Sequence, residues 1–217
     1  MSTASDPFVI AIVLGLLALA PVIAIMVTSF AKLIIVMGLA RNALGLQQVP
    51  PNLVLNGLAL VLSMYVMAPI GTQMFQLAEQ RTSNSQLTPK VLFEIASSVR
   101  EPLREFLGKH AQPRERQFFV ESAVKLWPAE QASGLTDKDL MVLVPAFTVS
   151  ELTAAFKIGF LLYLAFVVID LVVANVLVSL GMMMFSPTVV SIPLKLLLFV
   201  LLDGWSKLIH GLILTYR

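Results

Sequence analysis

Five of the charged residues between Pro145 and Arg217 lie inside or at the edges of long apolar runs. A charged group at the centre of a bilayer is unfavourable by about 2.5–3.5 kcal/mol, so such groups are normally paired, face other protein, or line water. In this setting they have two kinds of chemistry: they relay protons, or they form ion pairs with neighbouring groups. The residues concerned are Glu151, Lys157, Asp170, Lys195 and Asp203.

Two of the five have simple local explanations. The sequence from Thr148 to Glu151 has the form of a capping box, in which Glu151 binds the first amide groups of a helix. Lys157 follows six residues later, and its long side chain can extend to a membrane surface. Each explanation is an alternative to a role in ion pairing.

Asp170 has no such local explanation. Only twelve residues separate it from Lys157, about 18 Å of helix, which is too short to cross a bilayer between charges. On one helix, Lys195 and Asp203 would differ by about 80° and about 12 Å, too far apart to pair directly. Each is therefore expected to meet a charge on another helix or another copy, and Asp170 with Lys195 is the first predicted pair, within or between subunits.

Motifs for catalysis are absent from the sequence. An intramembrane enzyme would need a nucleophile with its base, a pair of catalytic carboxylates, or a metal-binding motif, and none of these patterns is present. There is no cysteine, and His110 and His210 have no neighbouring ligand residues. The sequence therefore predicts no enzyme, no metal site and no cofactor. A proton-coupled transporter with Asp170 as the relay is the alternative, although the duplicated halves of many transporters are not evident.

The composition is that of a membrane protein with several spans. Hydrophobic residues make up 58% of the chain and charged residues 13%, and the mean hydropathy is +0.87. The charges divide the chain into an apolar part at residues 1–78, a charged part at 79–139 and an apolar part at 140–217. Because the formal net charge is only +2 and no basic run occurs, nucleic acid is not an expected partner.

The apolar parts predict an all-α fold with about four long, kinked hydrophobic helices arranged in hairpins. The segment from Pro7 to Ala31 carries no charge and is long enough to span ~30 Å of hydrocarbon. We interpret it as a span rather than a cleaved signal sequence, with Pro21 as a kink in a continuing helix. The turn from Gln47 to Asn52 separates it from a second span, at Leu53 to Leu77, and the two form a hairpin.

Two amphipathic helices are predicted in the charged part. One opens at Pro89 and stops at Gly108, and the other runs from about Arg114 to Trp127. Either they form a small cap on their own subunit or they contact a neighbouring subunit. The positive-inside rule places Arg41 on the cytoplasmic side, so residues 79–139 are predicted to be an extracytoplasmic insertion.

Three consecutive methionines, Met182, Met183 and Met184, precede Phe185-Ser186-Pro187. Methionine is ordinarily a filler of hydrophobic cores. Three consecutive residues of a helix, however, fan over about 200° and cannot all point into one core, and the Ser-Pro sequence indicates that the helix is ending. In a ring of copies such a loop would form a deformable apolar constriction, and hydrophobic constrictions close channels by excluding water.

Several of these motifs resemble the SctR/FliP family of type III secretion export-gate proteins. The first motif is Pro145-Ala-Phe-Thr-Val-Ser-Glu-Leu-Thr-Ala-Ala-Phe-Lys-Ile-Gly-Phe160. The second is Pro193-Leu-Lys-Leu, five apolar residues and then Leu202-Asp-Gly-Trp205. In the first hairpin, Arg41-Asn-Ala-Leu-Gly and Gln47-Gln-Val-Pro-Pro-Asn52 are similar to the family as well. The resemblance spans nearly the whole chain.

The resemblance implies a structural, pore-forming subunit of the bacterial type III secretion export gate, the conduit that exports unfolded proteins across the inner membrane. It implies about five copies, with partner subunits of the SctS/FliQ and SctT/FliR types. These subunits wind into a helical cone that projects to the periplasmic side, so that nominal spans contact protein more than membrane lipid. Flagellar members often begin with a cleavable signal sequence, which is not expected here, so the virulence-type injectisome branch is favoured.

The resemblance also implies roles for individual residues. Met182, Met183 and Met184 would form the methionine gasket that seals the closed channel. The five charged residues would lie in protein interfaces and pair across them. The turn of the first hairpin would contain Arg41, Gln47, Gln48, Pro50 and Pro51.

Overall fold

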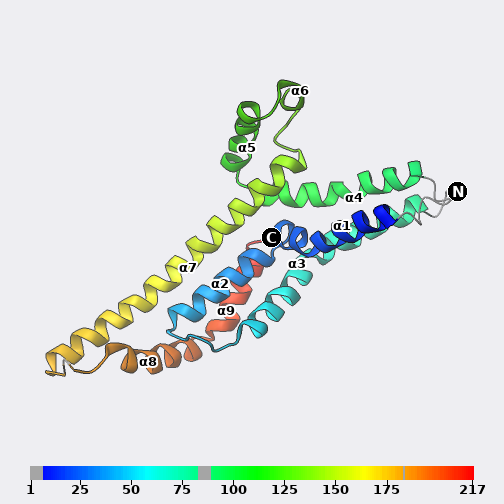
Figure 1. Ribbon diagram of the computed structural model, residues 1–217. Helices are drawn as coiled ribbons and strands as arrows, with labels where there is room; N and C mark the ends of the chain where they lie inside the picture. The colour runs from blue at the N-terminus through cyan, green and yellow to red at the C-terminus, as the bar shows by residue number, and fades with distance from the viewer. Residues whose placement is uncertain (1–6, 83–88, 183) are drawn as a thin grey trace.

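The structure, a computed structural model, is built from α-helices (Figure 1). It describes residues 7–82, 89–182 and 184–217. Within these residues the prediction of an all-α fold is confirmed. The helices are α1 (Pro7–Val27), α2 (Phe30–Ala43), α3 (Asn52–Thr82), α4 (Pro89–His110), α5 (Pro113–Leu126), α6 (Ala129–Ala132), α7 (Leu140–Ser179), α8 (Pro187–Leu201) and α9 (Gly204–Leu214).

Two helices are long and apolar enough to cross a membrane on their own, Asn52–Gln80 within α3 and Leu140–Ser179, which is α7. Two further pairs of helices, each bent at a short break, are long and apolar enough when the two helices of the pair are taken together. Pro21–Val27 and Phe30–Ala43 are bent by 78°, and Pro187–Leu201 and Gly204–Leu214 by 62°. By length and composition, the described residues thus contain two to four candidate spans, which agrees with the predicted set of about four kinked helices.

The first predicted span bends at a different place from the one expected. Pro21 lies inside α1, as predicted, but the helix breaks just before Phe30. Ser29 is fully buried at the break, and its hydroxyl donates a 3.1 Å hydrogen bond to the hydroxyl of Ser63 in α3. The amide of Phe30 donates to the hydroxyl of Thr28. Side-chain hydroxyls therefore replace helical hydrogen bonds at the break and tie it to α3.

The forty-residue helix α7 is the spine of the molecule (Figure 1). At about 1.5 Å per residue it is ~60 Å long, and α2, α4, α5 and α8 all pack against it. Gly159 lies where α2 contacts α7, and a Cβ at this position would overlap with the side chain of Leu39. Glycine at position 159 therefore allows the two helices to approach closely.

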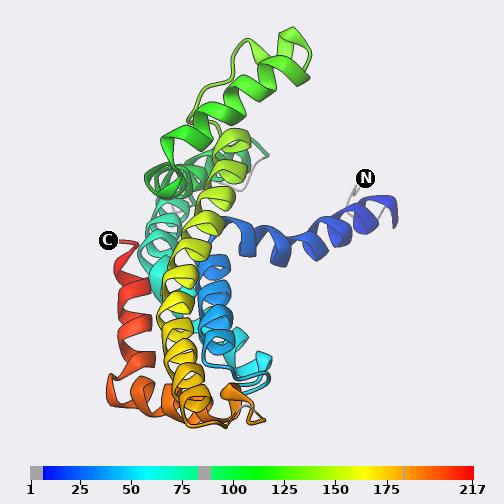
Figure 2. The same ribbon diagram turned by 90° about the vertical axis from the view of Figure 1, so that its left-hand side faces the viewer.

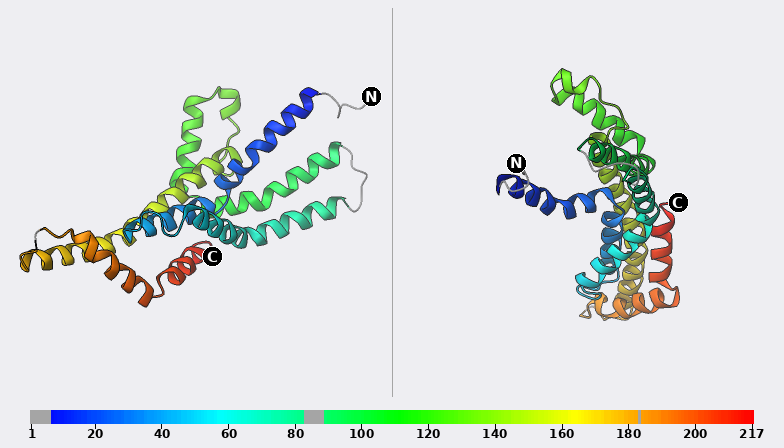
Figure 3. Two further views of the ribbon diagram at one scale, coloured as in Figure 1. Left: turned by 60° about the horizontal axis from the view of Figure 1, so that its bottom comes forward. Right: turned by 90° about the vertical axis from the view of Figure 1, so that its right-hand side faces the viewer.

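The other helices extend from this spine in different directions. α4 packs along both α3 and α7, while α5 and α6 stand beyond the first turns of α7 (Figure 1). α8 and α9 fold back from the far end of α7. Helix α1 projects away from the rest of the chain, on the side opposite α9, as Figures 2 and 3 show.

Among the residues that the structure describes, the buried apolar side chains form three clusters rather than one core. The first joins the end of α1 to α4 and the start of α7, the second joins α2, α3, α7 and α9, and the third joins the ends of α2 and α8 to α7. Many large apolar side chains stay exposed along α3, α7 and α8. Apolar surfaces of this extent mark contacts with other protein or with lipid.

Both amphipathic helices predicted in the charged part are present, as α4 and α5. The second half of α4 packs on its own chain, since Phe106 and Leu107 are buried against Phe147 of α7. Helix α5 also packs on α7, through Phe119, but leaves Phe118 largely exposed. The described part of these helices thus forms a cap on its own subunit, with one apolar side of α5 uncovered.

Candidate functional site

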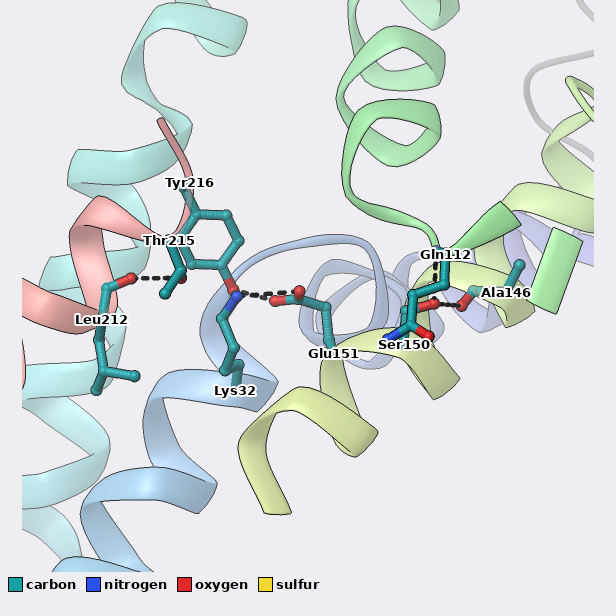
Figure 4. A network of polar contacts seen from close by, with 8 residues as sticks. All are labelled: Lys32, Gln112, Ala146, Ser150, Glu151, Leu212, Thr215 and Tyr216. Carbon is teal, nitrogen blue, oxygen red and sulfur yellow. Dashed lines mark hydrogen bonds and ion pairs between the residues drawn. The ribbon is translucent and has the colours of Figure 1, made fainter. Parts of the chain in front are cut away.

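Glu151 lies at the centre of a buried polar network where α2, α7 and the C-terminal residues meet (Figure 4). Its Oε1 accepts a hydrogen bond from Lys32 Nζ at 3.1 Å, and its Oε2 accepts one from the hydroxyl of Tyr216. The Lys32 and Glu151 side chains are only 4% and 5% exposed. Lys32 Nζ also lies 3.8 Å from the ring centroid of Tyr216, a cation–π contact. One carboxylate therefore joins three segments of the chain.

The capping-box interpretation of Glu151 is wrong. Helix α7 begins at Leu140, with Asp139 at the N-cap position, so Glu151 lies well inside the helix. The backbone amide and the hydroxyl of Thr136 both donate to Asp139 Oδ2, and these hydrogen bonds lower the pKa of the Asp139 carboxyl. This turn fixes the start of α7 before the motif at Thr148–Glu151 is reached.

Ser150, the residue before Glu151, binds the corner between α4 and α5. The backbone amide of Gln112 donates to Ser150 Oγ at 2.9 Å, and the Ser150 hydroxyl donates to the carbonyl of Ala146 at 2.6 Å (Figure 4). Ser150 therefore attaches the corner between α4 and α5 to α7. Its neighbour Glu151 attaches α2 and the C-terminal residues to the same helix.

Aromatic rings cover the Lys32–Glu151–Tyr216 network from the side of α4. The ring of Phe106 stacks on that of Tyr216, with 6.1 Å between the ring centroids. The ring of His110 lies edge-on to that of Tyr216, with 5.2 Å between the centroids. Burial, and after it the positive charges of Lys32 and Lys109, lower the pKa of His110 from 6.5 to about 4. His110 is therefore neutral at physiological pH and adds no second positive charge beside Lys32.

A second ion pair joins α7 to α8. Lys195 Nζ lies 2.6 Å from Asp170 Oδ2 and also donates to the carbonyl of Ala43 at 3.3 Å. The side chain of Lys195 is 4% exposed, whereas that of Asp170 is 39% exposed. The structure thus brings together the first predicted pair within a single chain, and Lys195 ties both helices to the end of α2.

The other two charged residues do not join these pairs. Lys157 is exposed on α7 beside Phe156 and Phe160. Asp203 is exposed at the break between α8 and α9, in the left-handed region at φ 52°. Since α8 ends at Leu201, Lys195 and Asp203 do not share one helix. Among the residues that the structure describes, neither Lys157 nor Asp203 has an ion-pair partner.

Arg41 closes the turn of the first hairpin from the last turn of α2. Its Nη1 donates to the carbonyl of Pro50 at 3.1 Å and to Asn52 Oδ1 at 2.7 Å. The chain leaves α2 through Gly45, whose φ of 80° favours glycine. Arg41 therefore fixes the geometry of the turn, whose remaining predicted residues lie at its partly or fully exposed outer side: Gln47, Gln48, Pro50 and Pro51.

The methionine loop, residues 180–186, connects α7 to α8 at the far tip of the molecule (Figure 1). Met182 is 36% exposed and Met184 fully exposed, and Phe185 beside them is also exposed. Met183 lies outside the described residues. At least two of the three predicted methionines therefore stand at the surface of the hairpin tip, and no core in the described chain receives them.

Two members of the polar network, Lys32 and Tyr216, were not predicted from the sequence. Lys32 directly follows an uncharged stretch of twenty-five residues, Pro7 to Ala31. This position next to a long apolar segment was a usable signal that the Lys32 side chain is buried. No local pattern marks Tyr216, because a tyrosine near a chain end is unremarkable in composition. Only contact with Glu151 reveals its role.

The two ion pairs are suited to holding helices together. Each of the buried charges, Lys32, Glu151 and Lys195, meets an opposite charge at hydrogen-bonding distance, which offsets the unfavourable burial of that group. Among the described residues, no group of three or more His, Cys, Asp or Glu side chains could hold a metal ion.

Comparison with known proteins relates the whole chain to one family. Residues 13–212 match the FliP family. Hypersensitivity response secretion protein HrcR of Ralstonia nicotianae is 54% identical over 207 residues, which cover 93% of each chain. Yop proteins translocation protein R of Yersinia pestis is 52% identical over 214 residues, which cover 97% of each chain.

A more distant relative extends over the full length. Virulence protein YscR of Salmonella typhimurium is 41% identical over 218 residues, which cover 100% of both chains. The names of these relatives refer to secretion, translocation and virulence, in agreement with the resemblance found in the motifs. Because the match covers nearly all residues at this level of identity, the chain belongs to the FliP family.

Proposed function

We propose that this protein is a structural, pore-forming subunit of the type III secretion export gate in the bacterial inner membrane. The FliP family is a family of membrane proteins of the secretion apparatus and not an enzyme family. With partner subunits, the chain forms the conduit through which unfolded proteins leave the cytoplasm. Relatives named for virulence, Yop translocation and the hypersensitivity response support the injectisome branch.

One structural observation carries this proposal: the buried charged groups within the apolar helices are paired with opposite charges inside the chain, while the outer apolar faces remain open. Glu151 and Lys195 are nearly fully buried, and each has its counter-charge within the chain. The exposed faces of α3, α7 and α8 present large apolar side chains instead. This is the surface that a wall-forming subunit needs, with a stable interior and several sides for neighbours.

The methionine loop supplies the constriction of the proposed conduit. Each copy presents flexible thioether side chains at the tip of the α7–α8 hairpin, where Met182 and Met184 are exposed. Several copies would bring these loops together as one apolar ring. Such a ring excludes water and ions when closed, and the flexible methionine side chains can rearrange around a passing polypeptide.

The proposed assembly contains about five copies of the chain with subunits of the SctS/FliQ and SctT/FliR types. Residues 79–139 face the periplasm as an extracytoplasmic cap, between the apolar parts at 1–78 and 140–217. Lys157 and Asp203, which have no ion-pair partner among the described residues of one chain, pair with charges across subunit interfaces. Glu151, Asp170 and Lys195 serve instead as inter-helix pairs within each copy.

Native mass spectrometry of the gently extracted complex tests this function. The expected spectrum shows several copies of the chain together with smaller and larger partner subunits. Lys157→Glu should reduce this species, because the substitution reverses a charge on an apolar outer face, whereas Lys125→Glu, a similarly exposed lysine of α5, should leave it unchanged. A stable monomer as the sole species under gentle extraction would exclude the proposal.

A further inference from the structure

Helix α1 is an apolar arm whose described side chains between Ala11 and Met26 are exposed. No charged residue occurs from Pro7 to Ala31, and Leu14, Leu19 and Val22 are each more than half exposed. The arm is attached at its C-terminal end, where the hydroxyl of Thr148 donates to the carbonyl of Met26. Beyond this attachment α1 projects away from the other helices (Figures 2 and 3). An apolar helix in this position needs a partner from outside the chain.

A long apolar groove lies between α3 and α9. It consists of two adjoining hollows of about 550 and 610 Å³, which share Tyr65, Ile213 and Leu214. Most of its lining is apolar, and its cationic groups are confined to Arg217 in one hollow and His210 in the other. The groove follows α3 from Val61 to Thr72, about 17 Å along the helix axis, so it can receive three turns of another helix.

The arm and the groove lie on opposite sides of the molecule. In Figure 2, α1 extends to one side of the spine and α9 stands at the other edge, and the right-hand view of Figure 3 shows the same separation from behind. A surface and its receptor on opposite sides of one chain cannot meet within that chain. Repeated between copies, such a contact is heterologous, and it produces a ring or a helical array.

We propose that α1 of each copy docks in the α3–α9 groove of the next copy. This inference rests on the proposed function, because it requires the chain to assemble in several copies. It identifies the two surfaces that join neighbouring subunits around the conduit, and it assigns a partner to the arm that the isolated chain leaves exposed.

Gly15 favours a protein helix rather than lipid as the partner of α1. A Cβ at this position would meet no atom within 4 Å, so packing within the chain does not require glycine there. Glycine inside a helix is destabilising relative to alanine, but small residues allow two helices in a membrane to approach closely.

Disulfide cross-linking between two copies tests the inference, because the natural chain contains no cysteine. Two differently tagged full-length chains are co-expressed with their partner subunits, one carrying Leu19→Cys in α1 and the other Leu214→Cys in α9. A disulfide forms only when the two Cα atoms approach within about 7 Å. The expected result is a cross-linked species that carries both tags after mild oxidation and disappears on reduction.

The matched control combines Leu19→Cys with Leu171→Cys, because Leu171 is exposed on α7 to a similar extent as Leu214 but lies outside the groove. This pair should give no product with both tags. Equal cross-linking of both pairs would overturn the inference, as would attachment of a photoreactive group at residue 19 to lipid alone. If neither pair cross-links while native mass spectrometry still shows several copies, the docking inference is wrong and the proposed function stands. If the chain is solely monomeric, both are wrong.

Discussion

Tyr216 and Glu151 are separated by 65 positions in the chain, yet the hydroxyl of Tyr216 donates a hydrogen bond to the buried carboxylate of Glu151. The other oxygen of the same carboxylate binds Lys32. Tyr216, the first third of α7 and the start of α2 therefore depend on one acidic group. Substitutions at these positions are expected to act through the stability of the fold before they affect secretion.

Glu151→Gln should strongly destabilise the protein. The amide keeps the shape of the side chain but leaves Lys32 buried without a counter-charge, which lowers the free energy of unfolding by about 3–5 kcal/mol. Thermal unfolding in detergent measures the loss. The double substitution Lys32→Met with Glu151→Leu should lose less than Glu151→Gln alone, because no uncompensated charge remains. A double variant that is less stable than the single one would contradict the ion-pair account.

Tyr216→Phe should have a smaller effect of the same kind. The substitution keeps the ring that covers Lys32 but leaves Glu151 Oε2 without its donor, and an unsatisfied buried polar group lowers stability by about 1–3 kcal/mol. The control is Tyr65→Phe, since Tyr65 is 69% exposed and should change stability by no more than about 0.5 kcal/mol. Equal effects at both positions would show that the Tyr216 hydroxyl is not part of the network.

Asp170→Asn should impair assembly rather than transport alone. The buried ammonium group of Lys195 lies 2.6 Å from Asp170 and loses its counter-charge in this variant. The exchanged pair, Asp170→Lys with Lys195→Asp, should recover part of the assembled complex on native mass spectrometry. A variant that assembles normally but transports nothing would indicate a proton relay, and with it the transporter function.

Acidification should destabilise the cap formed by α4 on α7. The pKa of His110 is about 4 in the folded protein, against 6.5 as its ordinary value, so between these values the unfolded state binds more protons than the folded one. Stability contributed by neutral His110 is therefore present above pH 6.5 and is lost as the pH falls towards 4. The groups facing His110 are Lys32, Lys109 and Tyr216, and none of them titrates ordinarily in this window.

Unfolding midpoints measured between pH 7.5 and 4.5 test this dependence. His110→Phe keeps an aromatic ring beside Phe106 and removes the titrating group, so its midpoint should fall less than that of the natural protein. His210→Phe is the control, because His210 is exposed on α9 and should leave the pH dependence unaltered. If the unfolding midpoint of His110→Phe falls with pH as steeply as that of the natural protein, the acid sensitivity belongs to other groups.

Replacing Met182, Met183 and Met184 together by alanine should make the closed gate leak ions. Alanine lacks the long thioether side chains that would meet around the channel axis, so the constriction should stay wider and hydrated. Ion conductance across the inner membrane measures the effect. Met64 and Met141, which are also exposed, provide controls as alanine variants. Unchanged conductance with normal assembly of the triple variant would exclude the seal.

The class of fold and the family could be predicted from the sequence because both depend on local patterns. The uncharged run from Pro7 to Ala31 and the apolar residues around Pro145–Phe160 indicate helices of membrane type without reference to any neighbour. The amphipathic helices α4 and α5 were also predictable, since their apolar residues recur with the period of a helix. The motifs that resemble the family were recognisable for the same reason.

The tertiary structure decided which charged groups meet. The pair of Asp170 with Lys195 could be proposed from charge alone. Whether the two residues pair within one chain or between two copies could be decided only from the coordinates. The pairing of Glu151 with Lys32 and Tyr216 had no local signal, because it depends on how closely α2 approaches α7, and that approach is set by Gly159 against Leu39. Hydrophobic periodicity is a property of neighbouring residues, whereas a counter-ion is chosen by packing between helices that are distant in sequence.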